Sequence, residues 1–223
     1  MASHKDRLGL AVLISGRGSN LKSLIDHFGP GTNASPIEIR LVISNRREAA
    51  GLGHAIAAGI PHVVIEQERP GTRREFDLAM DQALRKAGVE FLALAGFMRI
   101  IGDEFNEGWL DRMVNIHPSL LPAFKGLDTH RRALEAGVRF HGCTVHFVRP
   151  ELDAGPILAQ AVVPVLPGDD VASLAARVLK AEHRLYPDAL RLIAERRVRV
   201  GDGIVHIDGS AFTDGLWFNP LGS

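Results

Sequence analysis

Short apolar runs alternate with amphipathic stretches along the first half of this chain, and this alternation limits the folds that it can adopt. Leu8–Ile14 is a continuous apolar run, as expected for a strand that is covered on both faces. Apolar residues recur at helical spacing from Leu21 to Phe28, and Ile37–Ser44 has the character of a second buried strand. Repeated β-α units of this kind predict a parallel sheet with helices on both faces.

The next elements continue the alternation. Further helices are expected at Ala49–Ala58, Phe76–Ala87 and Thr129–Ala136, where glycines follow as stop signals. Further strands are expected at His62–Ile65 and Phe91–Ala95. The sheet should therefore grow through β-α units well past the middle of the chain.

The pattern changes in the last third of the chain. Gly142–Val148 and Ile157–Val165 are strand-like and have no helix between them, so they should pair antiparallel. A long amphipathic helix begins at Val171, and Pro187 should kink or restart it. Val198–Ile207 has a Gly-Asp-Gly turn between β-type residues and predicts a hairpin.

We therefore predict an α/β fold in a single domain, with an open, twisted, Rossmann-like sheet. The sheet should be mostly parallel with an antiparallel C-terminal part. The 223 residues lie within the range of one large domain. The domain is expected to span residues 1–223, with its core from Leu8 to about Arg197 and a hairpin and tail at 198–223.

Composition and charge narrow the class of protein. Lys+Arg and Asp+Glu both number 26, and this balance argues against a general nucleic-acid binder, which would carry a basic excess. The single cysteine, Cys143, excludes an intrachain disulfide and fits a reducing compartment. The N-terminus is polar and Leu8–Ile14 is short, so neither a signal peptide nor a membrane span is predicted. A soluble, cytoplasmic protein is expected.

The strand expected at Met113–His117 ends in two polar side chains. Residues two apart on a strand point to one face, so Asn115 and His117 should point out together. Pro118 cannot donate to a ladder, and the strand should therefore stop at His117. In open α/β sheets ligands bind beyond the carboxyl ends of the strands, which makes this pair a candidate site. A turn in which both side chains satisfy local backbone groups is the alternative.

A glycine-rich turn, Ser15–Asn20, joins the first strand to the first helix. The free N–H groups and the positive dipole end of a helix suit a phosphate, and glycines permit close approach of the backbone. The third glycine of the dinucleotide fingerprint and the Gly-Lys-Ser/Thr of a Walker loop are absent. The turn is therefore either a phosphate site or a tight connection.

Three further features suit ligand binding. The loop Gly96–Ile101 is apolar, so it either covers the core or lines a pocket for a flat apolar ligand. Arg73 and Arg74 lie at a helix start, where they are either solvated or in contact with an anion. Glu182 lies on the apolar stripe of the long helix, and a carboxylate there needs a partner or a ligand.

Asn115, His117 and Asp153 together suggest a chemistry. An amide can donate to a developing oxyanion, a histidine can move a proton, and a nearby carboxylate favours the charged imidazolium. No serine or cysteine lies in a nucleophile elbow, so the nucleophile should belong to a substrate. This pattern predicts acyl transfer between two bound molecules. A metal site is the competing interpretation because the chain has ten histidines, but no compact ligand motif is present.

These motifs give the chain a resemblance to the glycinamide ribonucleotide formyltransferases of purine biosynthesis. The likeness runs in one colinear order through almost the whole chain and is weakest at the end. NIHPSLLP with a later LDAGP is specific to the folate-dependent formyltransferase fold. The matching segments are Val12–Asn20, Ala95–Ile100, Asn115–Pro122, Thr129-His130, Leu152–Ile157, Glu182-His183 and Tyr186-Pro187.

The resemblance implies transfer of a formyl group from 10-formyltetrahydrofolate to the amine of glycinamide ribonucleotide. His117 would be the catalytic imidazole and Asn115 the oxyanion donor. Asp153 would support His117 and help proton transfer through water. Both ligands are small molecules, and the resemblance implies no metal, no nucleic-acid partner and no membrane. The chain would act as a monomer or homodimer.

The resemblance also assigns binding residues. Gly18, Ser19 and Asn20 would hold the substrate phosphate, and Glu182 would contact its ribose. The residues assigned to the folate are Arg74, Met98, Arg99, Ile100, Ile101, Asn115, Arg149, Pro150, Glu151, Leu152 and Asp153. Arg17 departs from the pattern, because relatives often have a small or amide residue there, and it is left out of the site.

Three alternatives remain open. A formyltetrahydrofolate deformylase shares the catalytic trio, but it usually has an N-terminal regulatory domain and a second histidine where Pro118 stands. The first strand is expected from Leu8, which leaves no room for such a domain. A methionyl-tRNA formyltransferase needs a further C-terminal domain, for which this chain ends too soon. A non-enzymatic nucleotide-binding module would not need Asn115, His117 and Asp153 together.

Overall fold

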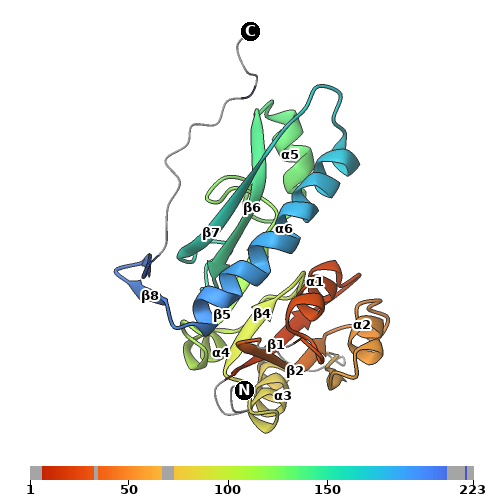
Figure 1. Ribbon diagram of the computed structural model, residues 1–223, viewed down its shortest axis with the longest axis vertical. Coiled ribbons are helices and arrows are strands. Elements are labelled where there is room, and N and C mark those ends of the chain that lie inside the picture. Colours follow the sequence, from red (N-terminus) through yellow and green to blue (C-terminus); the bar gives the residue numbers. More distant parts are fainter. Residues whose placement is uncertain (1–6, 33–34, 67–72, 210–218, 220–223) are drawn as a thin grey trace. The chain divides into compact units, whose positions relative to one another are not determined.

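The computed structural model describes residues 7–32, 35–66, 73–209 and 219 (Figure 1). Part of the predicted C-terminal tail lies outside these residues. The elements follow the expected order, with one additional short helix. They are β1 (Leu8–Ile14), α1 (Ser19–Phe28), β2 (Ile37–Ser44), α2 (Leu52–Ala57), β3 (His62–Val64), α3 (Arg73–Lys86), β4 (Phe91–Leu94), α4 (Asp103–Gly108), β5 (Met113–His117), α5 (Thr129–Glu135), β6 (Phe140–Phe147), β7 (Ile157–Pro164), α6 (Val171–Ala194), β8 (Val198–Gly201) and β9 (Ile204–Ile207).

The strands pair as the β-α alternation predicts. The strand order is β3-β2-β1-β4-β5-β6-β7. From β3 to β5 the neighbouring strands are parallel, whereas β6 and β7 are antiparallel. The hairpin of β8 and β9 forms a separate antiparallel pair. The mostly parallel sheet, its antiparallel C-terminal part and the hairpin are therefore confirmed.

The chain divides into two compact units, which are described separately. The first unit comprises Met1–Asn115 and Phe147–Pro150, and the second comprises Ile116–His146 and Glu151–Ser223. The first unit holds the strands β1 to β4 with helices α1 to α4. The second holds α5, most of β6, β7, α6 and the hairpin. The boundary passes through β5 between Asn115 and Ile116.

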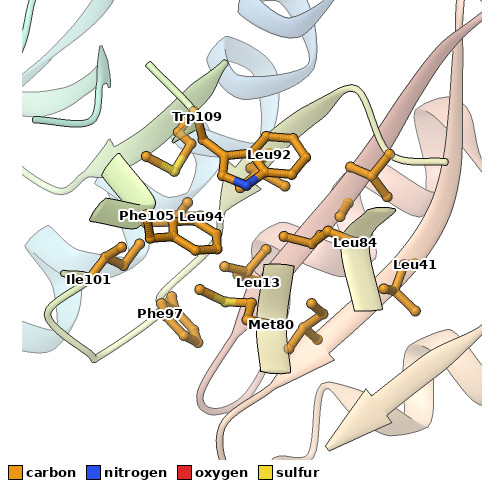
Figure 2. Packing of buried hydrophobic residues seen from close by; sticks show 14 of the residues in the cluster. Leu13, Leu41, Met80, Leu84, Leu92, Leu94, Phe97, Ile101, Phe105 and Trp109 are labelled. Carbon is orange, nitrogen blue, oxygen red and sulfur yellow. The ribbon is translucent and has the colours of Figure 1, made fainter. Parts of the chain in front are cut away.

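The core of the first unit covers both faces of its strands. Ala11 and Leu13 of β1 lie in one apolar cluster with α3, α4 and the loop before α4, and Figure 2 shows Leu13 beside Met80 of α3. The alternate residues Leu10 and Val12 are fully buried too, although they point to the other face. Burial on both faces explains why β1 is a continuous apolar run.

The second unit has a smaller core, which α6 closes. Leu174 and Val178 of α6 pack with Ala133 of α5, Cys143 of β6 and Val163 of β7, and α6 runs along β7 (Figure 1). Cys143 is fully buried within this cluster.

The helix α6 does not restart at Pro187. It is one helix from Val171 to Ala194 with the proline inside it. Tyr186 and Leu190 beside the proline are fully buried. The packing of this apolar face outweighs the single hydrogen bond that a proline cannot donate.

Two other elements differ from the prediction. The second helix begins at Leu52 rather than Ala49, because residues 49–51 form a turn in which the Gly51 N–H donates to the Gly16 carbonyl at 2.9 Å. The helix α4 was not predicted. It has only six residues, too few for the helical period to be recognised in the sequence.

Candidate active site

The carboxyl end of β5 places Asn115 and His117 on one face, as predicted. Asn115 is half-buried and His117 is buried. The strand ends at His117, directly before Pro118. Within the second unit, His117 Nδ1 lies 3.4 Å from Asp153 Oδ2 and His117 Nε2 lies 3.1 Å from the Phe124 carbonyl oxygen. A carbonyl only accepts, so Nε2 carries the hydrogen of that contact.

Asp153 is held in place by the backbone of a neighbouring loop. Its own backbone is left-handed, with φ of +48°, and its side chain is only 8% exposed. The Gly126 N–H donates to Asp153 Oδ2 at 2.8 Å. This hydrogen bond fixes the buried Asp153 carboxylate in its position beside the His117 imidazole.

A second imidazole faces the same carboxylate. His146 Nε2 lies 3.7 Å from Asp153 Oδ1, and His146 is buried on β6. Sequence reasoning placed His146 on this strand but gave it no role. No local signal marked it, because its contact with Asp153 depends on the path of the loop after β6.

The loop from Pro118 to Asp128 is ordered by β6 and β7. Thr144 Oγ1 donates to the Ser119 carbonyl at 2.7 Å and accepts from the Leu121 N–H at 3.0 Å. Gln160 Nε2 donates to the Leu121 carbonyl at 3.0 Å. These bonds satisfy buried backbone groups in the loop. They fix the chain just before Phe124, whose carbonyl contacts His117.

Two further histidines lie next to this loop. The rings of His130 and His141 meet edge to face with centroids 5.3 Å apart, and Phe124 lies 5.9 Å from His141. Burial lowers the pKa of His141 to about 4, and the charges of His130 and His117 act in the same direction, against the Pro118 carbonyl. Burial also lowers the pKa of His130. Burial therefore favours the uncharged form of both rings.

Glu182 is buried on α6, where the apolar stripe placed it. Its charge acts on two neighbours. Burial first, and then Glu182, raise the pKa of the Cys143 thiol to about 12. The same two causes raise the pKa of Tyr186 well above its ordinary value. The buried face of α6 therefore includes an acidic side chain close enough to affect both groups.

The glycine-rich turn of the first unit leads into α1 as predicted. Gly18 is left-handed, with φ of +73°, at the N-cap of α1. A Cβ on Gly18 would lie 2.5 Å from Gly51 Cα, so contact with the turn before α2 already requires this glycine. Ser19 and Asn20 are half-buried in the first turn of α1, and Arg17 is exposed.

The residues assigned to the folate are distributed over both units. In the first unit, Met98 and Ile100 are exposed and Ile101 is buried in the core. Arg74 pairs with Glu104 at 3.3 Å on an exposed surface, and Arg149 donates to the Val148 carbonyl at 2.9 Å.

The remaining part of the folate set belongs to the loop after β6. Pro150 is exposed and is the last residue of the first unit. In the second unit, Glu151 lies 3.4 Å from Lys125 Nζ, and Leu152 is exposed. Exposed apolar residues in such loops are available to a ligand.

Comparison with known proteins identifies the family. A family model described as "Formyl transferase" matches residues 8–190. The phosphoribosylglycinamide formyltransferase of Haemophilus influenzae is 41% identical over 202 residues, which cover 91% of this chain and 94% of that protein. The chain belongs to the phosphoribosylglycinamide formyltransferase family. A solved phosphoribosylglycinamide formyltransferase from Anaplasma phagocytophilum matches with a TM-score of 0.84 and 44% identity, over 92% of this chain and 97% of that one.

Two further matches set the limits of the family assignment. The trifunctional purine biosynthetic protein adenosine-3 of Gallus gallus is 50% identical over 197 residues, which cover 88% of this chain but only 19% of that protein. The chain therefore spans about a fifth of that relative. A solved formyltetrahydrofolate deformylase from Pseudomonas syringae shares only 25% identity, with a TM-score of 0.83, over 90% of this chain and 66% of that one. The formyltransferase family is clearly the closer of the two.

Two kinds of feature are absent from the described residues. No helix among them is long and apolar enough to cross a bilayer. Among the same residues, no group of three or more His, Cys, Asp or Glu side chains is placed to hold a metal ion.

Proposed function

We propose that this chain transfers a formyl group from 10-formyltetrahydrofolate to the amine of glycinamide ribonucleotide in de novo purine biosynthesis. The family membership supports the reaction, because the chain spans almost the whole length of single-function relatives. One observation carries the mechanism: a buried imidazole, His117, lies against a buried carboxylate, Asp153, at the end of a central strand. Such a pair suits proton transfer and charge stabilisation.

In the proposed mechanism, the amine of the substrate attacks the formyl carbon of the donor. A tetrahedral intermediate forms, and its oxygen becomes negative. Two acceptors flank the His117 ring, the Phe124 carbonyl at Nε2 and the Asp153 carboxylate at Nδ1. Each of these groups can accept from a ring N–H, so the site has an acceptor for a hydrogen on either nitrogen of an imidazolium. This positive charge, with the amide of Asn115 as donor, would stabilise the oxyanion.

A proton must also leave the attacking amine. Asp153 is the proposed group that guides this proton, through water and together with His117. The collapse of the intermediate breaks the bond from the formyl carbon to the folate nitrogen, which takes up a proton. The protein supplies no covalent nucleophile in this scheme, so its main contribution is the position and charge of the three side chains.

The binding roles complete the proposal. Gly18, Ser19 and Asn20 would hold the phosphate of glycinamide ribonucleotide through the start of α1, which has ten residues and no acidic residue in its first turn. Glu182 would accept hydrogen bonds from the ribose. The folate would contact Arg74, the loop from Met98 to Ile101, and Asn115. The segment Arg149–Asp153 is the remaining part of the proposed folate site.

We also propose a setting for this activity. Residues 1–223 would form one formyltransferase domain with its core from Leu8 to about Arg197. The protein would work in the cytoplasm as a monomer or homodimer, without a metal. Its partners would be the two small molecules, and it would need neither nucleic acid nor a membrane.

The decisive experiment compares transfer with hydrolysis. Purified protein is incubated with 10-formyltetrahydrofolate, with and without glycinamide ribonucleotide, and the formation of tetrahydrofolate, formate and formylated nucleotide is followed. We expect formylated nucleotide and tetrahydrofolate in equal amounts when both ligands are present, and little turnover of the donor alone. Formate release that does not depend on the nucleotide would contradict the proposal and indicate a deformylase.

A further inference from the structure

The loop between β4 and α4 has two apolar side chains that are exposed. Met98 is 63% and Ile100 is 65% exposed, whereas Phe97 and Ile101 are buried in the core of the first unit. Figure 2 shows Phe97 and Ile101 within the cluster that also holds Met80 and Phe105. The buried pair holds the loop to the core, while Met98 and Ile100 remain available to a flat apolar ligand.

Hydrogen bonds fix this loop at both ends. At its start, the Met98 N–H donates to Oγ of the buried Ser15 at 2.7 Å. At its end, the Gly102 N–H donates to Asp77 Oδ2 at 2.9 Å. Asn106 Nδ2 adds a bond of 3.2 Å to the Gly102 carbonyl. The backbone of Met98 is therefore anchored directly, and Ile100 lies between it and the anchored Gly102.

The burial of Asp77 is unusual for a carboxylate that only anchors a loop. It lies on α3 and is only 8% exposed. Its Oδ1 atom has no hydrogen-bond partner among the described residues. Burial raises the pKa of this carboxyl, against the Gly102 N–H and the charges of Arg99 and Arg73. A buried carboxylate with one unsatisfied oxygen destabilises a fold, so a role beyond stability is the simplest reason to have one here.

Arg99, in the middle of the loop, packs against α3. Its guanidinium carbon lies 3.8 Å from the centre of the Phe76 ring, and Phe76 precedes Asp77 on α3. Burial lowers the pKa of Arg99, the charge of Asp77 opposes this, and Arg73 adds to it. Arg99, which separates Met98 from Ile100, therefore packs its guanidinium on the Phe76 ring of α3.

Gly102 has little space between its backbone and the Asp77 carboxylate. A Cβ on Gly102 would lie 2.6 Å from Asp77 Oδ2. A side chain at residue 102 would therefore require the Asp77 carboxylate to shift.

We infer that Asp77 is a positioning residue for the folate donor: it holds Gly102, at the end of the loop, so that Met98 and Ile100 face the ligand. The inference rests on the proposed folate contact of this loop. Asp77 touches neither ligand, so its loss should change the affinity for the donor and leave the chemical step unchanged. Affinity for glycinamide ribonucleotide should also be unchanged.

The test compares Asp77→Ala and Asp77→Asn with a matched control on the same helix. Asp81 is one turn further along α3 and accepts from Trp109 Nε1 at 2.9 Å and Arg85 Nε at 2.7 Å. Asp81→Asn therefore disturbs a carboxylate of α3 that has no contact with the loop. KM for each ligand and kcat are measured for all three variants, and folding is checked by thermal unfolding.

We expect Asp77→Ala to raise the KM for 10-formyltetrahydrofolate about tenfold, the loss of a hydrogen bond to a charged group. The KM for the nucleotide and kcat should stay at the wild-type values. Asp77→Asn keeps an oxygen that can accept from Gly102, so it should recover most of the donor affinity. Asp81→Asn should leave both KM values unchanged.

A fourth variant tests separately whether this loop contacts the folate donor. Ile100→Ala removes an exposed loop residue and should also raise the KM for the donor. If Ile100→Ala has no effect in an active enzyme, the assignment of the loop to the folate fails. If Ile100→Ala raises the KM and Asp77→Ala does not, or if Asp81→Asn raises it equally, the positioning role of Asp77 is overturned.

Discussion

Asp77 in the first unit and Asp153 in the second are two buried carboxylates that hold backbone in the same way but have different basic side chains near them. Each accepts a glycine N–H through Oδ2, from Gly102 at 2.9 Å and from Gly126 at 2.8 Å. Asp153 then faces the imidazoles of His117 and His146.

The charges that act on Asp77 belong instead to two guanidiniums, those of Arg99 and Arg73. An imidazole gains and loses a proton near neutral pH, whereas a guanidinium stays charged. The comparison indicates that one architecture serves two purposes. Beside imidazoles the carboxylate can take part in proton transfer, and beside guanidiniums it can only fix geometry.

The largest effect is expected for Asp153 and the imidazole of His117 beside it. Asp153→Asn and His117→Ala should each lower the rate of formyl transfer by about 10²–10⁴-fold, the range for an acid–base group. The double variant should be little slower than His117→Ala, because residues that act as a unit are strongly non-additive. Single-turnover transfer with both ligands saturating measures these rates. Fully multiplicative losses would show that the two residues act independently.

A second prediction concerns pH and the histidines of the second unit. The pKa of His141 falls to about 4 in the folded protein from an ordinary value of 6.5. The unfolded chain therefore binds a proton between pH 6.5 and 4 that the folded chain does not. Stability should be full above pH 6.5 and should decline as the pH falls toward 4, by at most about 3 kcal/mol from this group.

Urea unfolding at pH 7.5 and pH 5 measures this decline. His141→Leu cannot be protonated, so it should lose less stability between the two values than the wild type. His206→Gln changes an exposed histidine of the same unit and serves as the control. An equal decline in wild type and His141→Leu would exclude His141 as the source.

A third buried carboxylate extends the comparison. Glu182 lies on α6 with Cys143 and Tyr186 within reach of its charge. If it binds the ribose, Glu182→Gln should raise the KM for the nucleotide about tenfold through one weakened charged hydrogen bond. The free energy of unfolding should change little. A protein that is strongly destabilised but binds nucleotide normally would make Glu182 a structural group.

The smallest expected effect is a difference in stability between variants of Gly102 and Gly126, the two glycines that donate to Asp77 and Asp153. Gly126 has φ of +79°, and a Cβ there would meet only Leu152 Cδ2, at 3.8 Å. Gly126→Ala should therefore cost about 1 kcal/mol of stability through left-handed backbone alone. Gly102→Ala should cost more, because its Cβ collides with Asp77 itself. Chemical denaturation of both variants gives the two values, and a reversed order would contradict this distinction.

Much of the fold could be predicted because its signals are local. The apolar run of β1 and the stop at Pro118 are properties of a few consecutive residues, and both elements lie where they were expected. The second-helix boundary depends on a contact between Gly51 and the distant Gly16 carbonyl. A contact across this separation leaves no trace in the local pattern, and the boundary was therefore misplaced.

The candidate site follows the same division. His117 and Asn115 were found because their spacing on a strand is visible in the sequence. His146 was not given a role, since its contact with Asp153 depends on the path of a loop. Asp77 was missed for a different reason. It follows Phe76 on an amphipathic helix, where an acidic residue is normally solvated, and only its burial reveals it.

The burial of Cys143 has a practical consequence. It is the single thiol of the chain, it is fully buried in the second unit, and its pKa is raised to about 12. Alkylating reagents react with the thiolate, so the folded protein should resist labelling at neutral pH. Any labelling that does occur then reports transient opening of the core between β6, β7 and α6. The wild-type chain thus has a built-in probe of the motions of one unit, against which ligands and variants can be compared.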